Sequence, residues 1–238
     1  MKPIRYAVLS TVVLMGSAGC EQVEPNSWVV LPGERVGPVS HTSDEDELVE
    51  TFGAEAVRPI QIYVGESSVV PGAPGALADD PMISGTEILP DSPDRVEILW
   101  WHPGERRCPY AAVFRETGSR WETGAGVRVG IGAEELERLN GSPFTFAGFE
   151  WDGSGEIRSW EGGLLETSHE IGIDFFGALT IRNVNDVSNR ELMSLSGSRS
   201  LRSDSPIVRR LDLELAVMGV LWSTAAAECS EEDREDGR

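Results

Sequence analysis

The run 126–163, GVRVGIGAEELERLNGSPFTFAGFEWDGSGEIRSWEGG, constrains the fold most, because it carries the signals for a helix, a turn and two strands in close succession. Segment 133–140 consists of good helix formers, with two acids in the first turn where the helix dipole favours negative charge. Asn140 and Gly141 tolerate the left-handed conformation that ends helices, and Pro143 prevents continuation. The run therefore predicts a short helix that stops at Gly141.

Two strands joined by a tight turn are expected after that helix. Aromatic residues dominate 144–151, and 156–160 alternates polar and apolar side chains as a half-buried strand does. The connection 152–155 contains two glycines, which readily supply positive φ. The pattern predicts helix, strand, hairpin turn and strand, with aromatic side chains in the core.

A similar pattern occurs earlier in the chain, at 42–53. Thr42 and Glu45 have the spacing of a capping box, and Gly53 is a stop signal like Gly141. An apolar segment with strand character follows each of the two helices. We interpret the similarity as a weak internal repeat with units 36–123 and 124–223. Two unrelated capped helices are the alternative.

Further strands are expected around 86–89, 95–101, 110–115, 171–182 and 213–222, with one helical turn at 190–193 and a short helix after Pro206. The fold class predicted is therefore α+β, an antiparallel sheet with short helices packed on one face. Its architecture is analogous to the β-lactamase-inhibitor protein and to small outer-membrane assembly lipoproteins, an analogy of fold alone.

The amino terminus, 1–19, predicts an export signal. Lys2 and Arg5 give a positive start, an apolar segment follows, and small residues precede Cys20. The apolar segment is too short to span a membrane. Cys20 after small residues is typical of bacterial lipoprotein processing, although Ser17 stands where leucine is usual. An ordinary cleaved signal peptide is the alternative.

Lipidation of Cys20 would hold the mature chain at a membrane surface without a spanning helix. Glu21, rather than aspartate, follows the cysteine, which favours the outer membrane of a two-membrane bacterium, facing the periplasm. Segment 20–35 contains prolines, glycine and polar residues and is expected to be a tether. At the other end, 224–238 is expected to be a disordered acidic tail.

The formal net charge is −20, from 40 acidic and 20 basic residues. A chain this acidic is a poor partner for nucleic acid, so none is expected. The hydrophobic content of 40% suits a folded globular protein rather than a disordered one.

Cys108 and Cys229 remain once Cys20 is assigned to the lipid. They can form a disulfide in an oxidising compartment, and two unpaired thiols are the alternative. The histidines, His41, His102 and His169, do not share metal-ligand spacing, and no phosphate-binding loop or hydrolase elbow is present. No metal and no cofactor are expected.

The hairpin carries the densest group of acids beside aromatic residues. Glu150, Trp151, Asp152 and Trp160 form a candidate binding surface. Carboxylates beside tryptophans can cleave a glycosidic bond, or the rings can stack on sugar. The alternative is that the acids lie on the solvent face and that Asp152 shapes the turn, which we favour.

The run resembles the pattern GxxxGxxxxELExxNGxPFxxxGFxWDxxGxxxxWxGG of an uncharacterised family of secreted bacterial proteins. The family usually reads GFGWD where this chain has Glu150, and the similarity extends more weakly from about 37 to 222. The resemblance implies a fold and no activity. The matching residues are Gly126, Gly130, Glu135, Leu136, Glu137, Asn140, Gly141, Pro143, Phe144, Gly148, Phe149, Trp151, Asp152, Gly155, Trp160 and Gly163.

Two functions are consistent with these features. The first is a non-catalytic envelope lipoprotein that binds a protein partner through an exposed face. The second is a protein that binds or hydrolyses glycans with the carboxylates and tryptophans of the hairpin. Catalytic residues are not expected under the first.

Overall fold

The computed structural model describes residues 28–65, 68–74, 81–151, 153–166, 175–184, 187–222 and Cys229. The predicted signal peptide 1–19, the lipidation site Cys20 and most of the tail 224–238 lie outside this range, so the structure leaves those predictions as they stand. Asp152 and His169 also lie outside the described residues.

The described chain is an α+β protein, which confirms the predicted fold class. Its helices and short 3₁₀ turns are α1 (Glu45–Phe52), η1 (Ala54–Ala56), α2 (Ala133–Asn140), α3 (Asn189–Ser194) and η2 (Val208–Arg210). Its strands are β1 (Val29–Leu31), β2 (Arg35–Val36), β3 (Val39–Ser40), β4 (Val57–Tyr63), β5 (Met82–Ile88), β6 (Val96–His102), β7 (Arg107–Phe114), β8 (Glu122–Thr123), β9 (Thr145–Ala147), β10 (Ile157–Ser159), β11 (Phe175–Asn183), β12 (Ser200–Arg202) and β13 (Asp212–Leu221).

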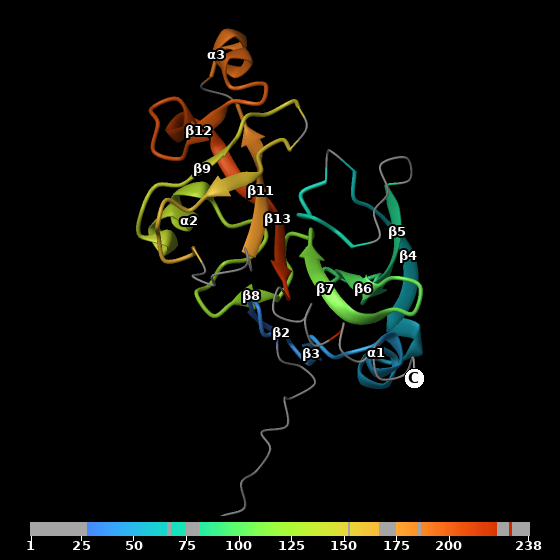
Figure 1. Ribbon diagram of the computed structural model, residues 1–238. Helices are drawn as coiled ribbons and strands as arrows, with labels where there is room; N and C mark the ends of the chain where they lie inside the picture. Colours follow the sequence, from blue (N-terminus) through green and yellow to red (C-terminus); the bar gives the residue numbers. More distant parts are fainter. Residues whose placement is uncertain are drawn as a thin grey trace, which may run out of the picture.

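The largest sheet has six strands in the order β11-β13-β7-β6-β5-β4, all neighbours antiparallel. A four-stranded sheet, β3-β2-β1-β8, and a three-stranded sheet, β10-β9-β12, pack around it. Figure 1 shows β13 at the middle of the molecule, between the part with β9, β12 and α2 and the part with β4 to β7. Strand β13 pairs with β11 along 212–220 but with β7 only at 218–221, so one strand joins the two parts.

This topology corrects the predicted division into repeats 36–123 and 124–223. As the repeat predicts, each half contains one such helix, α1 in the first and α2 in the second, and a strand follows each helix. The strands after α1 form a four-strand meander, whereas those after α2 form a short hairpin in another sheet. Each half therefore contains a helix followed by a strand, but the two halves differ in sheet topology. The six-stranded sheet takes strands from both halves.

The predicted tether 20–35 also needs correction, because the folded part of the chain already includes Trp28. Strand β1 pairs in parallel with β8, and β2 pairs with β1. The Trp28 ring lies edge-on to Trp121 at 4.8 Å, and the Arg120 guanidinium lies 3.5 Å from the Trp28 ring centre. Such a cation–π contact fixes the start of the fold.

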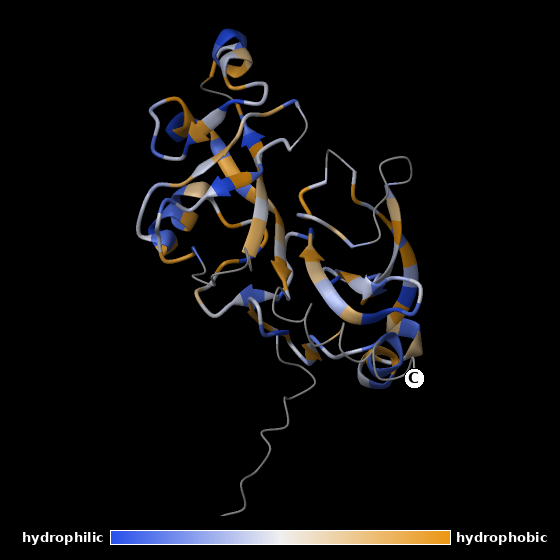
Figure 2. Cartoon of the chain, in the orientation of Figure 1, coloured by the Kyte–Doolittle hydropathy of each residue, from blue (hydrophilic) through white to orange (hydrophobic). Residues whose placement is uncertain are grey.

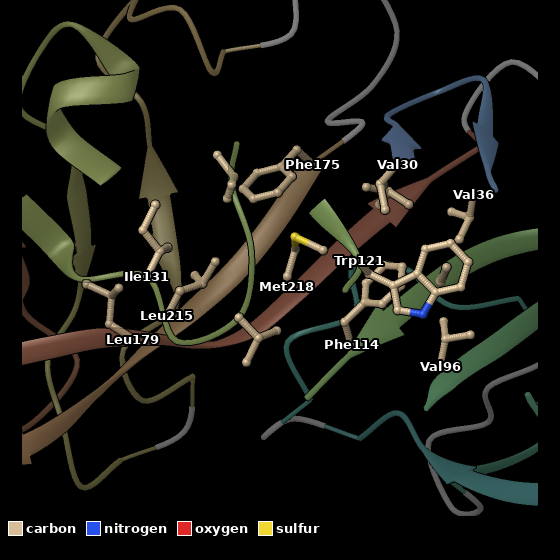
Figure 3. Packing of buried hydrophobic residues seen from close by; sticks show 14 of the residues in the cluster. Val30, Val36, Val96, Phe114, Trp121, Ile131, Phe175, Leu179, Leu215 and Met218 are labelled. Atoms are coloured by element: carbon tan, nitrogen blue, oxygen red, sulfur yellow. The ribbon is translucent and has the colours of Figure 1, made fainter. Parts of the chain in front are cut away.

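One large hydrophobic cluster connects the sheets, and it includes residues from both halves of the chain. Figure 3 shows Val96 and Phe114 from the first half and Leu215 and Met218 from β13 among its members. Helices α1 and α2 bury Leu48 and Leu136 in the same cluster. Orange segments recur along β4, β7 and β13 in Figure 2, as expected for strands that supply a shared core. Described residues from both halves of the chain therefore share this cluster.

The opposite face of the sheet carries a smaller cluster that includes Ile62, Leu99 and Val113. Val70 of the loop after β4 covers it, and the Tyr110 hydroxyl donates a hydrogen bond to the carbonyl of Pro71. Burial raises the pKa of Tyr110, so this hydroxyl stays protonated and available as a donor.

Buried polar groups attach α1 to the sheet. The Trp100 indole donates to the Thr86 hydroxyl at 3.0 Å, and that hydroxyl donates to the Glu45 carboxylate at 2.8 Å. Arg106 donates to the other Glu45 oxygen at 2.7 Å. The polar groups of Trp100, Thr86 and Glu45 therefore each have a hydrogen-bond partner, whereas the buried Nε of Arg106 has none. The cap of α1 is Asp44, whose carboxylate accepts from the Glu47 amide, rather than the predicted Thr42.

Candidate binding surface

Most family-motif residues in 126–163 have structural roles. The Trp160 side chain is only 6% exposed and packs against Phe144 and Phe175, with ring centres 5.3 and 5.5 Å apart. Trp160 was predicted to form part of the binding surface, and the structure corrects this: it is a core residue. The prediction was wrong because strand alternation alone does not tell which face of a short hairpin is covered.

Asn140, the last residue of α2, is fully buried and organises the end of the run. Its amide nitrogen donates to the carbonyls of Ser142 and Trp160, each at 2.8 Å. Its amide oxygen accepts from the Leu165 N–H at 3.1 Å. A Cβ at Gly163 would lie 2.2 Å from the Asn140 amide, so only glycine fits there. The position of the buried Asn140 side chain thus requires glycine at position 163.

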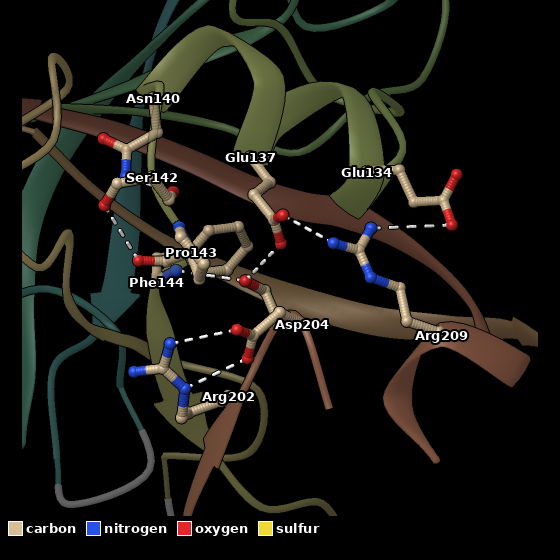
Figure 4. Close-up of polar contacts among 10 residues, drawn as sticks. Glu134, Glu137, Asn140, Ser142, Pro143, Phe144, Arg202, Asp204 and Arg209 are labelled. Atoms are coloured by element: carbon tan, nitrogen blue, oxygen red, sulfur yellow. Dashed lines mark hydrogen bonds and ion pairs between the residues drawn. The ribbon is translucent and has the colours of Figure 1, made fainter. Parts of the chain in front are cut away.

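Glu137 connects α2 to a segment sixty or more residues later in the chain. Its carboxylate accepts from the Ser203 hydroxyl at 2.6 Å and from Arg209. The Ser203 hydroxyl in turn accepts from the Phe144 N–H at 3.0 Å. Figure 4 shows this chain of contacts beside the separate Arg202–Asp204 ion pair. This network connects α2 to the residue before β9 and to the segment after β12 through the buried Ser203 hydroxyl, with the exposed Arg209 at its outer end.

Trp151 differs from the other motif residues, because its side chain is 65% exposed. Strand β9 ends at Ala147, so Trp151 lies beyond the sheet and has no core to face. Glu150, just before it, has φ of 60°, the left-handed region that favours glycine. Glu150 is exposed and accepts from the Ser196 hydroxyl at 3.0 Å.

Helix α3 lies next to this hairpin tip. The Phe149 N–H donates to the Leu195 carbonyl and the Gly197 N–H donates to the Phe149 carbonyl, each at 3.0 Å. These bonds place the end of α3 beside Glu150 and Trp151. Met193 of α3 is 75% exposed. We call the exposed side chains of Glu150, Trp151 and Met193 the tip surface.

The position of α3 is fixed by its own cap and by an ion pair. Ser188 and Glu191 form a capping box, and Glu191 also binds Arg210. Bonds from Arg210 and Ser188 lower the pKa of Glu191 to about 2, so it is charged at neutral pH. The sequence predicted one helical turn at 190–193 and did not predict these anchors. The capping-box pattern of Ser188 and Glu191 was the signal that could have shown the helix start.

The described hairpin acids, Glu150, Glu156 and Glu161, do not form the arrangement expected for glycan hydrolysis. Glu150 bonds to Ser196, and Glu161 accepts from Thr145 at 3.3 Å. Glu156 is half-buried; desolvation raises its pKa, and the charge of Arg158 opposes that effect. Two cavities of about 320 and 280 Å³ are lined by other segments, the first by β4 and Arg115 and the second by the start of α2 and Arg209. Neither brings hairpin carboxylates together.

Cys108 and Cys229 are joined by a disulfide, with Cα atoms 6.3 Å apart. Both residues are only 4% exposed. The bond connects the start of β7 to a residue that follows the last strand. Its burial makes it a structural bond rather than an accessible redox site.

Within the described residues, no group of three or more histidine, cysteine or acidic side chains could hold a metal ion. In the same part of the chain, no helix has the length and apolarity needed to cross a membrane.

Comparisons of the chain with protein-family models, with curated proteins and with solved structures found no match. Functional inference therefore rests on the geometry of the tip surface.

Proposed function

We propose that this chain is a non-catalytic, lipid-anchored binding module of the bacterial cell envelope, which holds a protein partner through the tip surface. The observation that carries the proposal is the 65% exposure of Trp151. Tryptophan is enriched among residues that dominate binding energy at protein interfaces. A tryptophan that the fold does not bury, within a run whose other aromatic residues it does bury, suits a contact residue.

Two further features support the proposal. Glu150 holds a strained backbone conformation beside Trp151, and such strain is concentrated at functional sites. The buried disulfide between Cys108 and Cys229 suits a chain that folds in an oxidising compartment outside the cytoplasm. The proposed anchor is the lipid on Cys20, which the export signal favours.

The partner is tested by capture from solubilised envelope extract with the lipidated protein as bait. We expect the Trp151→Ala variant to lose a partner that the wild type retains. Leu164→Ala is the matched control, because Leu164 is an exposed apolar residue of the same run, at 83% exposure, outside the tip surface. Equal capture by the wild type and both variants would contradict the proposal.

The anchor is tested separately by fractionation. We expect Cys20→Ser to move the protein from the membrane fraction to the soluble fraction of the envelope, because it removes the only acylation site that the sequence predicts. A variant that stays with the membrane would exclude lipid anchoring through Cys20.

A glycan-binding module is the second candidate, and the exposed ring of Trp151 is the observation that favours it, since tryptophan faces stack on sugars. Cosedimentation with purified peptidoglycan, with Trp151→Ala as the comparison, distinguishes the candidates. Sedimentation that depends on Trp151 would favour the glycan.

A further inference from the structure

The charge of this acidic chain is distributed unevenly. The chain has 40 acidic and 20 basic residues, yet the segment 182–210, which contains α3, β12 and η2, reverses that balance. It contains six arginines, at 182, 190, 199, 202, 209 and 210, against three acids, Asp186, Glu191 and Asp204. The positive charge lies next to the tip surface.

Four of these arginines bind carboxylates and are neutralised. Arg182 binds Asp212 and Glu214, Arg202 binds Asp204, Arg209 binds Glu134 and Glu137, and Arg210 binds Glu191.

Three arginines at the tip form no ion pair with any described residue. Arg158 of β10 donates to the Ser198 carbonyl at 3.1 Å, and Arg199 donates to the Ser196 carbonyl at 3.0 Å and to that of Ser194. Arg190 is exposed on α3. A hydrogen bond to a carbonyl oxygen fixes a guanidinium without neutralising its charge, and Arg158 has a nearby carboxylate, Glu156, that interacts with it electrostatically without forming an ion pair. We call Arg158, Arg190 and Arg199 the arginine rim.

One loop, 194–199, brings the rim and the tip surface together. Arg158 and Arg199 both bond to its carbonyls, and Glu150 accepts from its Ser196 hydroxyl. Arg190 precedes Met193 by three positions in α3, so the two side chains share a face. The rim therefore lies next to the exposed tryptophan and methionine of the tip surface.

We infer that the tip surface and the arginine rim together dock an acidic segment of a partner protein that also carries an apolar side chain. The inference rests on the proposed function and specifies its partner. Arginine, tryptophan and methionine are the residue types enriched at protein interfaces. The rest of the chain, being strongly acidic, repels such a segment, so electrostatics direct it to this one surface.

The position of the surface in the fold favours a protein over lipid headgroups. Figure 1 shows α3 at the opposite end of the molecule from β2 and β3, which follow the first described residues. A chain anchored through its amino terminus would present α3 away from the membrane. Glu150 within the tip surface also gives a local repulsion that the partner must avoid, which favours specificity over general anion binding.

The test measures the binding of fluorescein-labelled peptides by anisotropy. The probe alternates glutamate and leucine, and the controls replace glutamate by glutamine or by lysine. We expect the glutamate peptide to bind, the controls to bind at least tenfold more weakly, and the glutamate affinity to fall about tenfold between about 50 mM and about 300 mM NaCl.

The variant Arg158→Gln/Arg190→Gln should weaken binding of the glutamate peptide about tenfold. Arg128→Gln/Arg138→Gln removes the same charge from another face and should leave binding unchanged. Circular dichroism checks that both variants are folded. The inference is overturned if the glutamate and glutamine peptides bind with equal affinity, or if both double variants lose the same amount of binding. It is also overturned if the rim arginines are needed for binding to phosphatidylglycerol vesicles and the protein does not bind the peptide.

The same variants distinguish this failure from failure of the proposed function. If Trp151→Ala abolishes envelope capture but Arg158→Gln/Arg190→Gln does not, the binding module stands and the acidic partner is excluded. If neither variant changes capture, both proposals fail.

Discussion

At the residue scale, the side-chain amide of Asn140 alone makes several of the hydrogen bonds that hold the end of α2. Asn140 ends α2, bonds to two carbonyls and one N–H from three different positions, and is fully buried. The sequence predicted only that Asn140 and Gly141 stop the helix. It could not predict the partners, because they depend on how 160–165 returns past the helix end.

The first prediction concerns this residue. Asn140→Ala removes three buried hydrogen bonds and should reduce the free energy of unfolding by about 3 kcal/mol, at about 1 kcal/mol for each bond. Urea denaturation followed by tryptophan fluorescence measures the change. Asn189→Ala, an exposed asparagine at the start of α3, is the control and should cost less than about 1 kcal/mol. Equal losses would contradict the role assigned to Asn140.

Asp94 has a comparable role at the amino-terminal end of the fold. Burial alone would raise its pKa, but the side chain, backbone N–H and charge of Arg120, with Ser92, together hold that pKa below its usual value. The same Arg120 guanidinium lies over Trp28. Asp94 therefore positions the cation that holds the first described residue.

The second prediction follows from the lowered pKa of Asp94. Its ionised form stabilises the fold above the unfolded pKa, near 4, and this contribution is lost as pH falls through the lower folded pKa. Asp94→Asn should cost about 2 kcal/mol at pH 7, and the difference from wild type should shrink below about pH 4. Urea titrations across that pH range measure it. A difference that stays constant with pH would exclude a charge-dependent role.

The exposure of Glu150 and Trp151 could not be predicted from the sequence. Their exposure and the strain at Glu150 follow from the end of β9 at Ala147, which no local pattern marks. The aromatic run 144–151 therefore looked like one strand, whereas half of it is a turn that presents Trp151.

At the scale of elements, the edge strands of a sheet are where another chain can pair with the protein. Strand β4 is an outer strand of the six-stranded sheet. The Leu89 N–H donates to the Ala56 carbonyl and the Val64 N–H donates to the Pro81 carbonyl, so even-numbered residues of β4 bond inward. Pro59 therefore lies at a position whose backbone faces outward, where its missing N–H interrupts pairing with another chain.

The third prediction tests whether Pro59 prevents the edge strand β4 from pairing with another chain. Pro59→Val adds an outward N–H and a β-branched side chain, and it should cause concentration-dependent dimers or aggregates while lowering the stability of the monomer by at most about 1 kcal/mol. Size-exclusion chromatography with light scattering measures the association. Gln61→Val is the control, because it adds a β-branched residue on the same edge without a new N–H. Association of both variants to the same extent would show that side-chain character, rather than Pro59, sets the behaviour.

The accuracy of the sequence predictions differs with the range of the interactions. The strands β6 and β13 were predicted because alternation and continuous apolar residues are local signals. Val96, Ile98 and Trp100, which alternate along β6, all lie in the large core cluster. Strand β12 was not predicted, because it depends on pairing with β9, more than fifty residues earlier. The motif residues by themselves could not separate the buried Trp160 from the exposed Trp151.

At the scale of the whole molecule, the disulfide ties the end of the chain to the sheet. Cys108 and Cys229 are 121 residues apart in sequence and both are buried. A crosslink over so long a segment restricts the unfolded chain most strongly, with an upper limit of about 5 kcal/mol in the chain-entropy model.

The fourth prediction is that Cys108→Ser/Cys229→Ser lowers the free energy of unfolding by about 2–5 kcal/mol, while the folded protein still binds through the tip surface. Calorimetry measures the stability, and the peptide assay measures binding. In the wild type, a reductant should act mainly on the unfolded protein, since the bond is buried. Rapid reduction of the native protein would contradict a purely structural role.

Strand β13 gives the molecule a particular order of assembly. It emerges from the ribosome after every other strand of the described residues, and yet it lies between β7 and β11. Until residues 212–221 have been synthesised, the strands that it joins have no common neighbour, so a nascent chain cannot complete the sheet early. For a chain exported as its sequence predicts, this topology leaves the six-stranded sheet incomplete until residues 212–221 are available.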